Sequence, residues 1–304
     1  MKMEAEYRDG YLVSEAMKRV WAVELDLLRH FLDYCRRHQL RCWVEGGTLL
    51  GAVRHRGFIP WDDDVDLAMP RSDYDRMCQI GNDGIDEPYF LQTAWTDVDY
   101  HRGHAQFRRS DTAAIRPSDC FQPFNQGIFI DIFPLDASPD DPQLVHAHRR
   151  RCQKLLKFLK AKNTHCFYSG RLTLIFRKLR ARYLIHKNGW LYYYRQAEDE
   201  MRTLAQKPYD HVAELTSLGE EPRWPKHIFD QTVMLPFEDM EVPAPADYHT
   251  FLTCSFGPDY MTPVQAPSQH GSVVFDTTRS YRDVLPEVQR DYRRSLFQRL
   301  RKKL

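Results

Sequence analysis

The chain has 304 residues, of which 42% are hydrophobic and 28% charged, and its sequence includes 14 glycines and 18 prolines. These values predict a folded protein of one large or two small domains, and they exclude a short disulfide scaffold, a fibrous chain and a disordered chain. The net charge of +1 conceals a basic segment at 149–187, which holds thirteen of the 43 lysines and arginines and none of the 42 acidic residues. Such a segment favours contact with a polyanion or with an anionic membrane surface.

Three features that the sequence lacks predict where in the cell the protein is located. No apolar run approaches the roughly 18 residues of a membrane-spanning helix, and the acidic start MKMEAEYRDG lacks the apolar region of a secretory signal. The seven cysteines are scattered and form no C-x-x-C pair. We therefore expect a cytoplasmic protein with reduced thiols.

The first 135 residues predict a mixed α/β sheet. Apolar residues recur at helical spacing from Ser14, a suitable N-cap, to about Arg37, which indicates a long amphipathic helix. A short strand at 42–45 stops at Gly46-Gly47, and a helix follows from Thr48. The same criteria give a helix opening at Ser72, and further strands are expected at 64–68, 89–92, 105–109 and 127–133.

The remainder of the chain shows a different pattern. From 142 to about 201 it is helical and basic, from 208 to 267 it is proline-rich and irregular, and from 284 to 304 it is again helical. We divide the chain into a catalytic core at 1–140, a basic helical region facing the acceptor or the membrane at 141–205, and a C-terminal part at 206–304 that completes the domain.

The run WDDDVDLAM, from Trp61 to Met69, carries the strongest chemical signal. Side chains alternate along a strand, so Asp62, Asp64 and Asp66 are expected to share one face. Like charges repel at that spacing unless a cation lies between them, and oxygen ligands without His or Cys suit Mg²⁺ or Mn²⁺. The alternative is a solvated acidic loop.

A second acidic residue supports the metal interpretation. Asp131 lies within the apolar run Gly127 to Phe133, where a bare buried carboxylate is strongly disfavoured. Beside Asp64 and Asp66 on a neighbouring strand, it would complete a site of three carboxylates for two cations. The alternative is a structural Asp131 that caps the turn before Pro134.

The glycine turn precedes the acidic run. Gly46, Gly47 and Thr48 join a strand to a helix N-terminus, a geometry that favours close approach of a phosphate. A P-loop is excluded because Ala52 and Val53 stand where Lys and Ser or Thr are required. Ordinary strand-to-helix junctions also use such glycines.

The glycine turn and the acidic run belong to a longer stretch that resembles a known family. The run from Glu45 to Met77 resembles the signature of the LicD family of phosphotransferases, which includes bacterial phosphocholine transferases and is related to fukutin and fukutin-related protein. Further matching pieces are Phe107-Arg108, Asp111-Thr112 and the runs 127–136, 235–252 and 256–263. The last of these departs from the family pattern by one inserted residue and a single proline.

The resemblance implies a nucleotidyltransferase-like mixed sheet, of the α/β or α+β class, with an additional basic helical region. It implies metal-dependent transfer of a phospho-alcohol, with phosphocholine favoured, from a CDP-linked donor to a glycan hydroxyl with release of CMP. Asp64, Asp66 and Asp131 are the expected ligands of Mg²⁺ or Mn²⁺. The remaining expected roles are phosphate clamps for Arg54 and Arg108, general base or orienting group for Asp62, and ribose or supporting contact for Glu45.

Partners and alternatives complete the prediction. We expect a glycan acceptor that is free or lipid-linked, peripheral membrane contact through 149–187 at the inner face of the cytoplasmic membrane, and no nucleic acid. If the transferred group is choline, Trp43, Trp61, Trp95 and Tyr100 are candidates for an aromatic cage, although such rings are also ordinary core residues. The competing functions are an NMP-adding nucleotidyltransferase and a non-catalytic subunit of glycan assembly.

Overall fold

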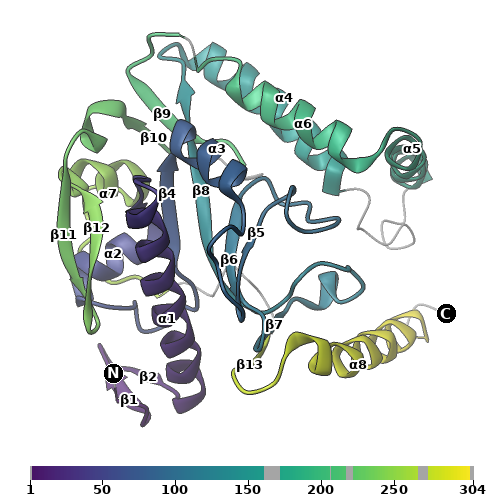
Figure 1. The fold of residues 1–304 in the computed structure, drawn as a ribbon, viewed down its shortest axis with the longest axis horizontal. Coiled ribbons are helices and arrows are strands. Elements are labelled where there is room, and N and C mark those ends of the chain that lie inside the picture. The colour runs from purple at the N-terminus through teal and green to yellow at the C-terminus, as the bar shows by residue number, and fades with distance from the viewer. Residues whose placement is uncertain (1, 161–171, 206, 217–221, 266–272, 302–304) are drawn as a thin grey trace.

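The computed structural model describes residues 2–160, 172–205, 207–216, 222–265 and 273–301 (Figure 1). Within these ranges, seven strands form the central sheet. They are β3 (Trp43–Val44), β4 (Asp66–Pro70), β5 (Tyr89–Gln92), β6 (Ala105–Arg109), β8 (Ile128–Ser138), β9 (His211–Glu214) and β10 (Arg223–Pro225).

Strand β8 organises this sheet. It pairs in parallel with β4 and antiparallel with β6 and then β9, and Asp131 and Ile132 have partner residues on both edges. The sheet is therefore mixed, as the sequence predicts. Because β8 lies inside the sheet, Asp131 is held on a rigid and well-covered strand.

Helices pack around the sheet (Figure 1). They are α1 (Glu15–Arg37), α2 (Gly46–His55), α3 (Arg71–Ile80), α4 (Pro142–Lys160), α5 (Leu172–Asn188), α6 (Trp190–Arg202), α7 (Tyr248–Phe256) and α8 (Tyr281–Arg301). Helices α1 and α3 both contact β8, while α4 and α6 pack against each other beyond the end of the sheet. No helix in the described ranges is both long enough and apolar enough to cross a bilayer.

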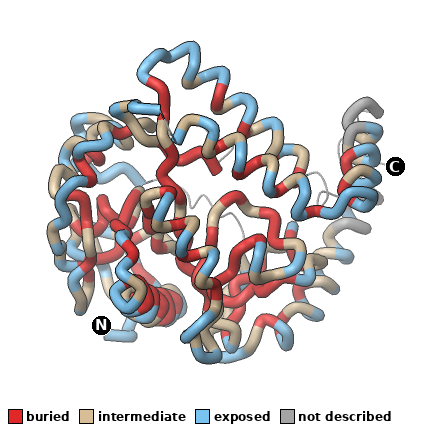
Figure 2. The backbone as a smooth tube through the Cα atoms, turned by 45° about the horizontal axis from the view of Figure 1, so that its top comes forward, coloured by how far each residue is buried: buried red, intermediate tan, exposed pale blue. Residues whose placement is uncertain are grey.

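The predicted first helix is confirmed. The Ser14 side chain accepts a hydrogen bond from the backbone nitrogen of Met17 at 3.1 Å. Arg36 and Arg37 lie in the last turn of the helix, where positive charges interact favourably with the helix dipole. Trp21 stacks on Phe58 at 4.6 Å between ring centroids. The buried face of α1 and the strands of the sheet form the main core, where much of the tube in Figure 2 is red.

The prediction of an irregular segment at 208–267 is wrong. This part contains β9 and β10 of the central sheet, the hairpin β11 (Thr232–Phe237) to β12 (Met240–Pro245), and α7. Prolines are tolerated in β11 and β12 because the two strands pair only with each other and each keeps a free edge. The prolines obscured the strand pattern of this segment, in which β10 pairs with β9, β11 pairs with β12, and β9 also pairs with β8 of the central sheet.

The fold also contains two smaller pairs of strands and a buried ion pair between α3 and β8. The strand pairs are β1 (Glu6–Arg8) with β2 (Tyr11–Val13) and β7 (Ala113–Ile115) with β13 (Val274–Asp276). The guanidinium of Arg71 on α3 donates to both carboxylate oxygens of Asp136 on β8, with Nε to Oδ1 at 2.6 Å. This pair fixes α3 against the strand that carries Asp131.

Candidate active site

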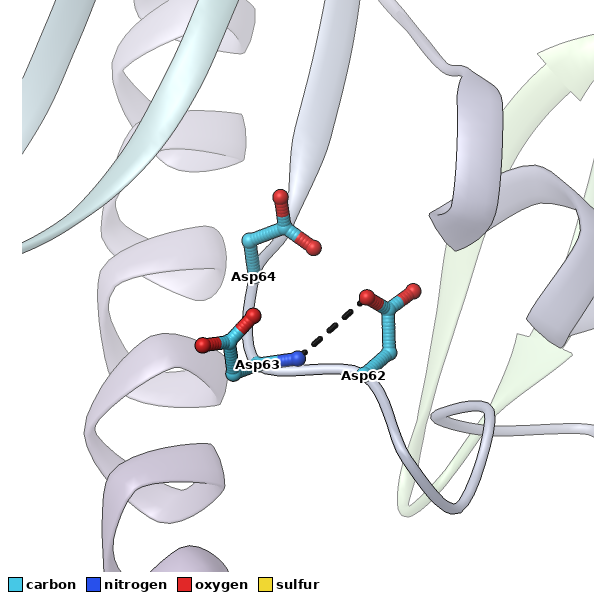
Figure 3. A group of neighbouring side chains, drawn as sticks. All are labelled: Asp62, Asp63 and Asp64. Carbon is cyan, nitrogen blue, oxygen red and sulfur yellow. Dashed lines mark hydrogen bonds between the residues drawn. The ribbon is translucent and has the colours of Figure 1, made fainter. Parts of the chain in front are cut away.

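The acidic run forms a loop before β4 rather than a strand. Asp62, Asp63 and Asp64 precede β4, which begins at Asp66, so the predicted alternation along a strand from 64 is wrong. The three side chains nevertheless converge: each offers a carboxylate oxygen within 4.8 Å of the others (Figure 3). The loop bends because the backbone nitrogen of Asp63 donates to Asp62 Oδ1 at 3.3 Å.

Asp66 and Asp131 are brought together by strand register. They occupy partner positions on the parallel strands β4 and β8. The backbone nitrogen of Asp66 donates to Thr48 Oγ1 at 2.9 Å, and the backbone nitrogen of Asp131 donates to the carbonyl of Val65 at 2.9 Å. Asp66 and Asp131 thus lie on neighbouring strands, Asp66 interacts electrostatically with Asp62 and Asp64, and the role of Asp64, Asp66 and Asp131 as metal ligands stays a prediction.

Electrostatics in this group favour a cation. Removal from bulk water raises the pKa of Asp64 and Asp66 well above the usual range, and neighbouring carboxylates, Asp66 for the first and Asp131 for the second, raise it further. Ionised carboxylates so close together require positive charge between them. Because every candidate ligand is a carboxylate oxygen, the residues fit a hard divalent cation such as Mg²⁺ or Mn²⁺.

The structure adds Glu24 to this group, which the sequence interpretation missed. Glu24 lies on α1, is 1% exposed, and its Oε2 atom has no hydrogen-bond partner in the described chain. Burial raises its pKa well above the usual range, and the neighbouring Asp63 carboxylate raises it further. The available signal was an acidic residue on the apolar face of an amphipathic helix.

The glycine turn packs directly against the acidic loop. A Cβ atom on Gly47 would lie 2.5 Å from Asp62 Oδ2, and Gly46 has a φ of +52°, a conformation that side chains rarely adopt. Glu45 precedes α2 as its N-cap residue, is buried, and donates its backbone N–H to the carbonyl of Asp66 at 3.0 Å. The turn therefore lets the acidic loop approach the start of α2, and its role as a phosphate cradle stays a prediction.

Asp131 has polar neighbours on β6 that the sequence interpretation did not select. Gln106 pairs with Asp131 across the β6–β8 ladder, and its side-chain amide donates to Asp131 Oδ1 at 2.5 Å. His104 Nε2 lies 3.2 Å from the same oxygen. Burial lowers the pKa of His104 although the neighbouring Asp131 raises it, which favours the neutral imidazole.

The two predicted phosphate clamps have different surroundings. Arg54 donates through Nη1 to the carbonyl of Tyr260 at 3.0 Å and thereby ties α2 to the loop that departs from the family pattern. Arg108 is 2% exposed and donates to the side chains of Gln92 and Gln106 and to the carbonyl of Gly127. Both guanidinium groups therefore hold protein oxygens, and their role toward phosphate stays a prediction.

The predicted aromatic cage is not assembled from the four rings that the sequence suggested. Trp43 and Tyr100 are 2% and 0% exposed and belong to the interior. Trp61 packs edge-on against Tyr11, with 6.0 Å between ring centroids, whereas Trp95 packs against Tyr194 of α6. The four side chains serve separate parts of the fold.

Comparison with known proteins identifies the part of the chain that contains this site. Residues 39–159 match the family model described as the LicD/FKTN/FKRP nucleotidyltransferase domain. That range includes every site residue selected from the sequence, from Glu45 to Asp131. Glu24 lies outside it.

Three relatives extend this result. The chain is 29% identical over 258 residues to the lipopolysaccharide cholinephosphotransferase LicD of Haemophilus influenzae, covering 78% of this chain and 88% of the relative. It is 37% identical over 78 residues to an uncharacterised protein of Rickettsia prowazekii, covering 26% and 27% respectively. It is 39% identical over 67 residues to the human ribitol 5-phosphate transferase FKRP, covering 21% of this chain and 14% of that protein.

Proposed function

We propose that this chain, whose residues 39–159 match the LicD/FKTN/FKRP nucleotidyltransferase domain, transfers a phospho-alcohol from a CDP-linked donor to a hydroxyl of a glycan, with release of CMP. The observation that carries the proposal is the register pairing of Asp66 with Asp131 beside the acidic loop 62–64. This geometry suits a phosphoryl-transfer site, in which clustered carboxylates hold divalent cations.

We favour phosphocholine as the transferred group and a cell-surface glycan, or its lipid-linked precursor, as the acceptor. The relative that aligns over 78% of this chain is named a lipopolysaccharide cholinephosphotransferase. The ribitol 5-phosphate transferase aligns over only 21%, so it supports the phospho-alcohol class more than the identity of the alcohol.

In the proposed reaction, the acceptor oxygen forms a bond to the transferred phosphorus while the bond from that phosphorus to the CMP oxygen breaks. Mg²⁺ or Mn²⁺ held by Asp64, Asp66 and Asp131 would neutralise phosphate charge and acidify the acceptor hydroxyl. Asp62 lies beside this set and is our candidate for the group that accepts the hydroxyl proton. Gln106 on β6 orients Asp131 through its hydrogen bond, and Glu24 on α1 adds a further carboxyl group near the set.

The direct test is a product assay. The purified protein is incubated with a glycan acceptor, Mg²⁺ and each of CDP-choline, CDP-ethanolamine, CDP-glycerol and CDP-ribitol, and released CMP is quantified. We expect CMP from one donor, and none from the Asp131→Asn variant or in excess EDTA. Release of pyrophosphate from a nucleoside triphosphate, with no CMP from any CDP donor, would instead favour an NMP-adding nucleotidyltransferase.

We also propose that α5 contacts an anionic membrane surface. Phe176, Leu179 and Tyr183 are 68%, 49% and 65% exposed, and their spacing places them along one side of the helix. The exposed Arg180, Arg182 and Lys187 lie among and beyond them, which is the composition of an interfacial helix. Residues 161–171 of the predicted basic segment lie outside the described residues.

Helix α4 does not share this role. Its Leu156 and Leu159 are buried inside the protein, Leu159 against Ile185 and Trp190. The prediction that the apolar residues of the whole segment 149–187 face a membrane is therefore wrong for α4. In a flotation assay, we expect co-migration with phosphatidylglycerol vesicles but not with phosphatidylcholine vesicles, and loss of co-migration in Leu179→Glu. Equal flotation of this variant and the wild type would contradict the proposal.

A further inference from the structure

Four cationic side chains interact electrostatically with one another, and three of them also interact with Asp131. They are Arg102, Arg108, Arg116 and Lys160. The guanidinium groups of Arg108 and Arg116 both lie over the ring of Phe129 on β8, at 4.7 and 5.9 Å from its centroid. Asp131 is within electrostatic reach of Arg102, Arg108 and Arg116.

The cations differ in how their charges are balanced. Arg102 pairs with Asp119 at 2.9 Å, and the donors of Arg108 are directed to Gln92, Gln106 and the Gly127 carbonyl. The Arg116 side chain forms no ion pair and no hydrogen bond with any described residue, and its buried Nε is left without a partner. A buried guanidinium donor without an acceptor is unfavourable, so Arg116 is held ready for an acceptor from outside the protein.

Electrostatics support the same conclusion. The pKa of Arg116 is lowered first by burial and then by the charge of Arg102, and the pKa of Lys160 is lowered by burial and by Arg102 and Arg116. These cations therefore repel one another in the absence of an anion. Asp119 and Asp131 supply the nearby negative charge, and Asp131 also faces the acidic loop.

We propose that Arg116, with Arg102 and Lys160, forms an anion site that binds a phosphate group of the substrate beside Asp131. A guanidinium offers paired donors that match phosphate oxygens, and Arg116 is partly exposed, so a ligand can reach it. Asp131 interacts electrostatically both with Arg116 and with Asp66 of the acidic group. A phosphate bound beside Asp131 would therefore contact Arg116 and, when a divalent cation is bound, that cation as well.

This inference deepens the proposed function but is tested separately from it. The phosphate belongs either to the diphosphate of the nucleotide donor or to a phosphorylated acceptor. In both cases the shared chemistry is a phosphate dianion or diphosphate, so inorganic pyrophosphate in EDTA is a probe that depends neither on a metal nor on activity.

The experiment measures pyrophosphate binding by calorimetry for the full chain and its variants. Loss of a charge-assisted pair predicts that Arg116→Gln binds at least about tenfold more weakly than wild type, and that Lys160→Gln is also weakened. Arg293→Gln is the matched control, because Arg293 also lies over a ring, that of Phe121 at 5.2 Å, but on the exposed surface of α8. Equal pyrophosphate affinity in wild type and Arg116→Gln overturns the proposal.

A second arm distinguishes the two sources of phosphate. If Arg116→Gln also weakens binding of CDP-choline and CMP, the site holds the donor; if it weakens pyrophosphate alone, the site holds a phosphate of the acceptor. Folding is checked by the melting temperature, which we expect to stay at or above the wild-type value because the substitution removes a repelled charge. A failed CDP-alcohol assay with intact Arg116-dependent pyrophosphate binding rejects the proposed donor and keeps the anion site.

Discussion

Gln106 lies directly opposite Asp131 across the β6–β8 ladder, and its amide nitrogen donates to Asp131 Oδ1 at 2.5 Å. The same side chain accepts hydrogen bonds from Arg102 and Arg108 through Oε1. One amide thus joins the acidic side of the site to the cationic side. The hydrogen bond from Gln106 goes to Asp131 Oδ1 and not to Asp131 Oδ2.

This link predicts a positioning role for Gln106. Gln106→Leu should lower turnover by about 10- to 100-fold, the usual effect of losing a partner that orients a metal-binding carboxylate. Mn²⁺ affinity, measured by calorimetry, should fall in parallel. Gln106→Asn, which keeps the amide on a shorter side chain, serves as the comparison; unchanged Mn²⁺ affinity in Gln106→Leu would show that the amide serves packing alone.

Removing a carboxylate should affect stability in opposite ways with and without metal. In EDTA, Asp66→Asn should melt a few degrees above wild type, because relief of repulsion worth about 1 kcal/mol shifts the melting temperature of a chain this size by roughly 2 °C or more. With Mg²⁺, wild type should gain stability and the variant should not. Thermal unfolding under both conditions is the measurement, and a variant less stable than wild type in EDTA would argue for a structural role of Asp66.

Two glycines of α2 should respond differently to alanine. A Cβ on Gly47 would approach the flexible carboxylate of Asp62 at 2.5 Å, whereas one on Gly51 would approach the backbone carbonyl of Gly57 at 2.4 Å. We expect Gly47→Ala to reduce turnover by at least tenfold with little loss of stability, because only the acidic loop must move. Gly51→Ala should instead destabilise the fold by about 1–3 kcal/mol. Urea unfolding and turnover of both variants test this contrast.

His101 predicts a component of the acid sensitivity of the fold. Burial, together with the neighbouring charges of Arg102 and Lys160, lowers its pKa to about 4 despite Asp119 nearby and a hydrogen bond with the Asp99 backbone. The unfolded chain binds a proton at this position near pH 6.5 and the folded chain only near pH 4, so stability falls as the pH falls through this window.

Urea unfolding of His101→Gln and wild type from pH 7 to pH 4 measures that component. Relative to wild type, the variant should gain up to about 3 kcal/mol across this range, since 1.36 kcal/mol corresponds to each pKa unit. His186→Gln on the exposed surface of α5 is the control and should follow wild type throughout. A constant difference between His101→Gln and wild type at every pH would contradict the prediction.

What the sequence determined is local. Ser14 and the apolar period after it were sufficient to define α1, and the alternation at 105–109 was sufficient to define β6, because caps and periodicity depend on residues a few positions apart. The sequence also suggested that Asp131 lies on a strand beside the one that carries Asp66, and the register of β4 and β8 confirms this pairing.

The tertiary structure decided which charges face one another. Glu24 reaches the acidic loop only because α1 packs across the sheet, and β9 joins the central sheet only through its pairing with β8, far earlier in the chain. Arg108 and Arg116 look alike in the sequence, yet Arg108 is enclosed by protein acceptors while Arg116 has none. The environment of a charged side chain is set by groups distant in the chain, and no local pattern specifies it.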